Sequence, residues 1–328
     1  MKNAITNRAT RNRLLASMAA FLFVTSGIAS AQAGKTYSQL KAEHPGWVQV
    51  PGALTSPDCV HRIPSGAKVD ESNGPTAGDV TLNGKLIAHY DSCAEASIPT
   101  RHIEQNPGTT GNGWVEDSQW FLSLKSGDNI DFLGGSWTVP SIPETYGALV
   151  YLFNGIQPSN GSWIMQPVLQ YGDNGNFGGN YWVLASWLVH SNTDYYVSSP
   201  VGVNPGDVII GQTYQTGVSG DDLEYFIYAN DVTNGQDSTL SVKSWGLHWT
   251  EAFAGVLEAY NVTSCSEYPS GRQGAVDFYK TTVAHGYPKL DWLTPAKFVG
   301  VQDDYFGNGG PSCDFSVSVS GGSSTLYF

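Results

Sequence analysis

The sequence predicts an all-β protein built as a sandwich or a barrel. From about residue 112 to the end, short apolar runs follow one another roughly every 8–15 residues, with turn signals between them. No amphipathic helix of about twelve residues or more is recognisable in this region. Several runs, such as 181–190, are apolar on both faces. That pattern is expected of strands that lie where two sheets pack together.

The expected strands can be identified in order from their apolar, aromatic and β-branched residues. Proline and glycine mark the turns between them, for example VNPGD at 203–207 and TNGQD at 233–237. The predicted strands after residue 112 are GGSWTVP, GALVYLF, SWIMQPVLQY, YWVLASWLVH, DVIIGQTYQ, LEYFIYAND, STLSVKSW, AFAGVLEAYNV, VDFYKTTV and CDFSVSVS.

The N-terminus has the pattern of a secretory signal peptide. Residues 1–13 carry four positive charges and no acid, an apolar run follows, and small residues offer cleavage sites after Ala31 or Ala33. We therefore expect residues 1–31 to be removed and the protein to be secreted to an extracellular location. No other segment is long and apolar enough for a membrane helix.

Residues 32–111 differ from the rest and are predicted to form a pro-segment or an accessory region, rich in β-structure. The Asn83-Gly84 step within them is typical of a tight hairpin turn. The segment 104–113, EQNPGTTGNG, has the composition of a linker or a long loop. We place a boundary there and expect residues 112–328 to form the sandwich domain.

The charge of the chain excludes several kinds of partner. Without residues 1–31 it has 12 Lys and Arg against 29 Asp and Glu, which leaves it strongly acidic. Because phosphate binding needs clustered cations, we expect neither nucleic acid nor a membrane surface as partner. An excess of carboxylates also suits acidic surroundings, where many of them are protonated.

Four cysteines follow the signal peptide, and they allow three pairings. In an exported chain two disulfides are expected. We predict Cys59–Cys93 and Cys265–Cys313, because each pair lies within one region of the sequence. No CxxC or HxxxH spacing is present, so the sequence gives no support for a metal site.

Two predicted strands carry polar residues among apolar ones. In MQPVLQYG, Gln166 and Gln170 lie four residues apart and project to the same face. In AFAGVLEAY, Glu258 shares a face with small apolar residues and with Tyr260. Burial of that face would raise the pKa of Glu258, which suits a group that acts first as base and then as acid. The alternative for both strands is a polar face in contact with water.

An ordered series of short matches between about residues 112 and 265 resembles the glutamic peptidases of the eqolisin type. The matching segments are SWTVPSIP, YLFNGIQP, VLQYG, VLASWLV, VNPGDVI, ANDVTNGQ and GVLEAY. The resemblance implies an antiparallel β-sandwich of two sheets, like the concanavalin A or lectin fold. It also implies a secreted, acid-acting endopeptidase whose catalytic pair is Gln170 in VLQYG and Glu258 in GVLEAY.

In such a pair the glutamate takes a proton from a water molecule, which attacks the scissile carbonyl, and then passes the proton to the leaving nitrogen. The glutamine amide donates hydrogen bonds to the oxyanion. This chemistry needs no cofactor, its partner is a protein or peptide substrate, and we expect a monomer. Further residues expected to contact the substrate are Gln166, Phe153, Gln157 and Trp187.

The chain departs from the family pattern at two acidic positions. Gln157 and Ser186 stand where the family has acids that line its cleft. Groups around a catalytic pair orient it and adjust its pKa, so the pH optimum and the substrate preference are not fixed by the resemblance.

Two other functions remain open from the sequence. A lectin-like sandwich could bind carbohydrate through aromatic side chains, although packing in the core is the plainer account of them. A glycan-degrading enzyme normally needs two carboxylates around the bond, so Glu251 or Glu224 would have to act with Glu258. The aromatic candidates for sugar contact are Trp163, Trp182, Trp187 and Tyr181.

Overall fold

The structure is a computed structural model of the whole chain. It describes residues 35–71, 77–93, 97–101, 111–122, 128–190, 194–244, 246–269, 274–293, 298–302 and 313–328. The predicted signal peptide, residues 1–31, and most of the predicted linker, 104–113, lie outside these ranges.

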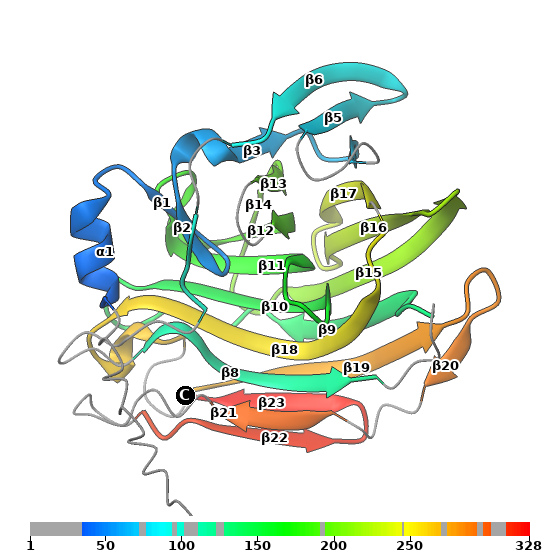
Figure 1. Cartoon of the computed structure of the whole chain (residues 1–328). Coiled ribbons are helices and arrows are strands. Elements are labelled where there is room, and N and C mark those ends of the chain that lie inside the picture. Colours follow the sequence, from blue (N-terminus) through cyan, green and yellow to red (C-terminus); the bar gives the residue numbers. More distant parts are fainter. Residues whose placement is uncertain are drawn as a thin grey trace, which may run out of the picture. The chain divides into compact units, whose positions relative to one another are not determined.

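Two large sheets make up most of the described chain (Figure 1). The first, sheet I, has the strand order β21-β8-β18-β10-β11-β12-β13-β3, with β14 paired to β12. Its strands are β3 (Val60–Ile63), β8 (Gly111–Phe121), β10 (Leu149–Pro158), β11 (Trp163–Asp173), β12 (Gly178–His190), β13 (Tyr195–Ser198), β14 (Val201–Val203), β18 (Trp249–Val262) and β21 (Val299–Gln302).

The second, sheet II, has the order β22-β23-β19-β9-β15-β16-β17-β4-β5-β6, with β20 paired to β19. Its strands are β4 (Ala67–Asp70), β5 (Ala77–Leu82), β6 (Lys85–Asp91), β9 (Phe132–Thr138), β15 (Val208–Ser219), β16 (Asp222–Asp231), β17 (Gln236–Ser244), β19 (Ala275–His285), β20 (Asp291–Leu293), β22 (Ser316–Ser320) and β23 (Ser323–Tyr327).

The remaining elements belong mostly to the N-terminal part of the described chain. Helix α1 (Tyr37–Glu43) begins at a capping box, in which Thr36 and Gln39 bond each other's backbone N–H groups. A small sheet of order β1-β2-β7 follows. Its strands are β1 (Val48–Val50), β2 (Ala53–Thr55) and β7 (Ile98–Pro99), and short 3-10 helices lie at Pro57–Cys59 and Cys265–Glu267.

The predicted two-sheet β-sandwich is confirmed, and each sheet is antiparallel except for one parallel pairing. The strand β3 pairs in parallel with β13 of sheet I, and β4 pairs in parallel with β17 of sheet II. Only the turn at 64–66 separates β3 from β4. The N-terminal part of the chain therefore extends both sheets at the same side of the sandwich.

The two faces of sheet I have different apolar partners. One face carries Val150, Leu152 and Leu257 into a core shared with Ile209 of β15 in sheet II. The other face belongs to a second core, in which Tyr37 and Leu40 of α1 and the β1-β2 strands pack against it. Members of this second core on sheet I include Tyr151, Phe153, Val168, Trp187 and Val256. Burial of that outer face thus depends on the N-terminal residues.

Both predicted disulfides are confirmed. Cys59 pairs with Cys93 and Cys265 pairs with Cys313, and the Cα atoms are 5.4 Å apart in each pair. Within the part of the chain that the structure describes, no helix is long and apolar enough to cross a membrane.

Replacing Cys59 and Cys93 together by serine is expected to destabilise the protein. The bond closes a stretch of 34 residues, and a loop of that size contributes about 3–4 kcal/mol in the chain-entropy model. The measurement is the denaturant midpoint of the double variant against wild type. An unchanged midpoint, with the disulfide of the wild type verified by mass, would contradict the prediction.

Candidate active site

Three side chains lie in one row across the outer face of sheet I. Tyr151 on β10 is the direct partner of Gln170 on β11 and, on its other side, of Glu258 on β18. Directly paired residues project to the same face of a sheet. The predicted catalytic pair therefore shares a face and is separated by one strand, with the Tyr151 ring between its members.

The carboxyl of Glu258 is fully buried and held from three sides. The Tyr260 hydroxyl donates to Oε1 at 2.5 Å, and the Gly52 backbone N–H donates to the same oxygen at 2.6 Å. The indole N–H of Trp114 donates to Oε2 at 3.1 Å. Thr100 Oγ1 lies 2.7 Å from the Tyr260 hydroxyl. These contacts fix the carboxyl in one orientation.

The surroundings of Glu258 raise its pKa from 4.5 to about 7. Burial is the largest cause, because a charge loses its hydration there. The hydrogen bonds from Tyr260, Gly52 and Trp114, and the nearby Arg101 cation, oppose the rise. Glu258 can therefore hold its proton in mildly acidic solution and release it near neutrality while the site stays covered.

The amide of Gln170 is only 1% exposed and is engaged by the turn that follows β11. Its Nε2 donates to the Gly172 carbonyl at 3.0 Å and to the Phe177 carbonyl at 2.9 Å. Its Oε1 accepts from Asn174 Nδ2 at 3.2 Å. Both amide hydrogens thus have backbone partners in this conformation.

The turn between β1 and β2 covers the row formed by Gln170, Tyr151 and Glu258. Gly52, at φ +79°, provides the N–H that reaches Glu258. The Tyr151 hydroxyl donates to the Gln49 carbonyl at 2.8 Å, and Gln49 Nε2 donates to Thr100 Oγ1 at 2.9 Å. Gln49 N–H also donates to the Asn174 carbonyl at 2.9 Å, so β1 bonds to the turn that holds Gln170.

Three of the predicted substrate-contacting residues lie on the same face as the row. Phe153 and Trp187 belong to the core beneath the N-terminal residues and are fully buried. Gln166 pairs directly with Trp187 and is 1% exposed. Neither amide atom of Gln166 nor the Trp187 indole nitrogen has a hydrogen-bond partner among the described residues. Buried polar groups normally find partners, so Gln166 is an unusual residue on this face.

The fourth predicted substrate-contacting residue, Gln157, belongs to a separate network of hydrogen bonds. Arg101 Nη1 donates to Gln157 Oε1 at 2.8 Å, and Gln157 Nε2 donates to Glu251 Oε2 at 2.5 Å. The Arg101 guanidinium also lies over the Trp114 ring, 3.9 Å from its centre. Burial raises the pKa of Glu251. This network reaches the Glu258 site through Arg101, which lies over the Trp114 ring, and through Trp114, which bonds Glu258.

Ser186 lies on the opposite face of sheet I from Glu258. Its hydroxyl donates to the carbonyls of Ile227 and Ser238, both on sheet II. It is thus part of the packing between the sheets. The sequence match to a cleft-lining glutamate does not correspond to a position on the Glu258 face.

The residues offered for carbohydrate chemistry are dispersed. Trp163, Trp182 and Trp187 are buried, whereas Tyr181 is exposed. Glu224 lies on sheet II and pairs with Lys68 at 2.7 Å. Glu251 bonds Gln157. These contacts do not bring Glu224 or Glu251 to Glu258 as a second carboxylate.

Sequence reasoning did not assign roles to several residues that contact the site. Tyr260 could have been found, because it is two residues from Glu258 on one strand face. Trp114, Thr100, Arg101 and Gly52 had no such signal, because they come from distant parts of the chain.

Solved structures of glutamic peptidases are similar to this chain. A scytalido-glutamic peptidase with a peptide-based transition-state analogue has 17% identity and a TM-score of 0.47, covering 67% of this chain and 100% of that one. SCP-B, an eqolisin-family peptidase in complex with the tripeptide Ala-Ile-His, has 17% identity and a TM-score of 0.44 over the same shares. The aspergilloglutamic peptidase from Aspergillus niger has 14% identity and a TM-score of 0.32, covering 55% and 98%. No protein-family model and no curated protein sequence matches the chain.

The raised pKa of Glu258 predicts a specific pH dependence of stability. A carboxyl whose pKa is higher in the folded than in the unfolded state contributes stability below pH 4.5, and this contribution is lost as the pH rises to about 7. We expect wild type to lose about 3 kcal/mol across this window relative to Glu258→Gln, which has no such titration.

Urea unfolding of both proteins at pH 4.5 and pH 7.5 measures this difference. The other buried carboxyls are common to both proteins, so their titration cancels in the comparison. Equal pH dependence of the two free energies of unfolding would exclude a raised pKa at Glu258.

Proposed function

We propose that the protein is a secreted, acid-acting endopeptidase with Glu258 as general base and acid. One observation carries the proposal: the buried carboxyl of Glu258 is held in place by Tyr260 and Trp114, and the backbone N–H of Gly52 bonds the same oxygen as Tyr260. A peptide segment is thus already seated against the carboxyl. No cofactor is required, the substrate is protein or peptide, and the enzyme acts as a monomer.

The position of the Gly52 nitrogen indicates where the reacting water would bind. With the β1-β2 turn withdrawn, a water molecule can donate to Oε1 of Glu258 in place of Gly52. The carboxylate takes a proton from this water as its oxygen bonds to the scissile carbonyl carbon. The C–N bond then breaks, and the same proton passes from Glu258 to the leaving nitrogen.

Withdrawal of the β1-β2 turn also changes the pH range in which Glu258 is ionised. Access of water lowers the pKa of Glu258 from about 7 towards its ordinary value of 4.5, because burial is the main cause of the shift. The open site therefore ionises at a lower pH than the covered site, so that a fraction of Glu258 is carboxylate in acidic solution where the covered site keeps its proton. Acid activity follows from the open form.

Gln170 is proposed to stabilise the oxyanion. It lies in the same row as Glu258, on the other side of Tyr151. Its amide hydrogens bond the carbonyls of Gly172 and Phe177, so the turn between β11 and β12 must release one of them on substrate binding. A single well-placed donor of this kind is worth about 3 kcal/mol in the transition state. Gln166, Phe153 and Trp187 would contact the substrate, with Gln157 at the margin.

Residues 32–111 are proposed to act as a pro-segment that closes the site. The contacts that close it come from Gln49, Gly52, Thr100 and Arg101. The same residues bury the outer face of sheet I, which an extended substrate would need.

An acid protease assay tests the catalytic assignment. Cleavage of denatured casein near pH 3–4 is expected, unaffected by pepstatin or chelators, and Glu258→Gln should reduce it by at least about 10³-fold. Glu251→Gln, a change of the same kind at a neighbouring carboxyl, should leave most of the activity. Cleavage that persists in Glu258→Gln refutes the assignment.

A substitution that weakens the contact of the β1-β2 turn with Glu258 should increase peptidase activity. Gly52→Pro removes the N–H that bonds Glu258, and proline cannot adopt φ +79°. We expect faster onset of casein cleavage at acidic pH than in wild type. Gly321→Pro, at a turn with φ +54° in the β22-β23 hairpin, is the control for backbone strain. If both variants behave alike, the turn does not restrain the site.

A further inference from the structure

Five aromatic rings form a continuous row on the outer face of sheet II. Trp292 lies 5.2 Å from Phe132, measured between ring centres, and Phe132 lies 6.3 Å from Tyr214. Tyr214 lies 5.5 Å from Phe226, which lies 6.1 Å from Tyr228. We refer to these five residues as the aromatic row.

The register of the sheet explains why the rings line up. Phe132 is the direct partner of Tyr214, and Tyr214 is the direct partner of Phe226. On the other side, Ala284 of β19 is the direct partner of both Phe132 and Trp292. Trp292, Phe132, Tyr214 and Phe226 therefore follow one another across the strands from β20 to β16, a distance of about 19 Å at the usual strand spacing, and Tyr228 lies two residues further along β16.

Small residues allow the rings to lie along the sheet. A Cβ on Gly134 would come within 2.8 Å of the Phe132 ring, so this ring occupies the space over the glycine. Ala284, also small, is fully buried between Phe132 and Trp292. The Phe132 and Tyr214 rings are within 25° of parallel, and those of Phe226 and Tyr228 within 24°, whereas Trp292 is inclined by 66° to Phe132 and Tyr214 by 55° to Phe226. Trp292 keeps 58% of its surface exposed.

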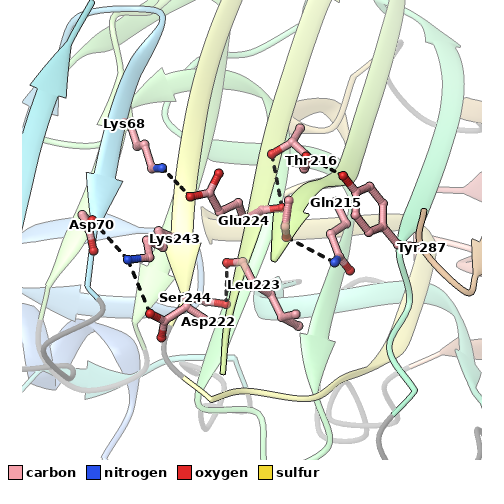
Figure 2. A network of polar contacts seen from close by, with 11 residues as sticks. Lys68, Asp70, Gln215, Thr216, Asp222, Leu223, Glu224, Lys243, Ser244 and Tyr287 are labelled. Carbon is pink, nitrogen blue, oxygen red and sulfur yellow. Dashed lines mark hydrogen bonds and ion pairs between the residues drawn. The ribbon is translucent and has the colours of Figure 1, made fainter. Parts of the chain in front are cut away.

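The row is uncharged, and the charged residues beside it pair with one another. Figure 2 shows the network next to the β15-β16 end, where Lys68 bonds Glu224 at 2.7 Å. Lys243 lies 3.7 Å from Asp70 and 3.4 Å from Asp222 in the same network (Figure 2). At the other end, Asp291 lies 3.8 Å from His285.

These charges narrow the class of ligand. Nucleic acid on an aromatic platform also needs a line of cations along its backbone, and here Lys68 and Lys243 are paired with carboxylates. An uncharged polymer with partly apolar rings matches the neutrality and the length of the aromatic row. Tyr214, Tyr228 and Gln212, which pairs directly with Gly134 and Tyr228, place hydroxyl and amide groups beside the rings.

We propose that the aromatic row is a binding site for an uncharged polysaccharide. Pyranose rings stack their apolar faces on exposed aromatic rings, that of Trp292 above all, and the tyrosine hydroxyls and the Gln212 amide bond the sugar hydroxyls at the edges. The site lies on the outer face of sheet II, whereas Glu258 lies on the outer face of sheet I. Binding here is independent of the proposed peptidase and would hold the protein on a glycan matrix.

Retention on microcrystalline cellulose and on chitin particles tests the proposal, with the full chain carrying Glu258→Gln so that proteolysis cannot interfere. Binding to at least one of the two polymers is expected. Trp292→Ala should weaken it about ten-fold. Tyr146→Ala is the control, because Tyr146 is 59% exposed and lies outside the row.

Phe226→Leu is a second variant, which distinguishes loss of the binding surface from loss of folding. It keeps apolar bulk on the strand and removes the ring face, so thermal stability should change little while retention falls. The proposal is wrong if neither polymer retains the protein, or if Trp292→Ala and Phe226→Leu bind as wild type does. It is also wrong if sedimentation shows that Trp292→Ala instead dissociates a dimer formed through this face.

Discussion

The hydrogen bond from the Gly52 N–H to Glu258 is the contact on which the described state of the site depends. It places a peptide group against a carboxyl that has no exposed surface. A buried carboxylate without donors would be costly, and donors from Tyr260 and Trp114 offset only part of that cost. The N-terminal turn and the catalytic candidate are therefore energetically coupled: whatever moves the turn also changes the protonation of Glu258.

The two outer faces of the sandwich both carry aromatic and polar side chains, but they differ in how far these side chains are buried. On sheet I, aromatic and polar side chains are covered by the N-terminal residues, and Gln166 is left without partners among the described residues. On sheet II, a row of aromatic rings stays partly open to solvent beside paired charges. The first arrangement buries polar groups beneath the N-terminal residues, and the second leaves aromatic rings accessible to a ligand.

The sequence was sufficient for the features that repeat locally. Alternation of side chains predicted the strands and the shared face of Gln166 and Gln170. The expectation of an exported chain predicted two disulfides, and the nearness of the cysteines in the sequence predicted their pairing. The sequence could not predict that β3 pairs in parallel with β13 and β4 with β17, because the register between distant strands is decided by tertiary packing. For the same reason it gave no sign that Thr100 and Arg101 reach the Glu258 site. The hydrogen bonds of Gln170 to a turn of its own hairpin depend on the path of that turn, which no periodic pattern encodes.

The placement of the disulfides has a consequence for any cut in the chain between residues 102 and 110. Both cysteines of each bond lie on the same side of such a cut. A nicked molecule would then be two polypeptides held together by non-covalent contacts alone: strand pairing, apolar packing, and hydrogen bonds such as those of Gly52 and Arg101. Their association would obey mass action, so dilution alone could separate them. Separation would also bare the backbone edges of β13 and β17, which are prone to self-assembly once unpaired.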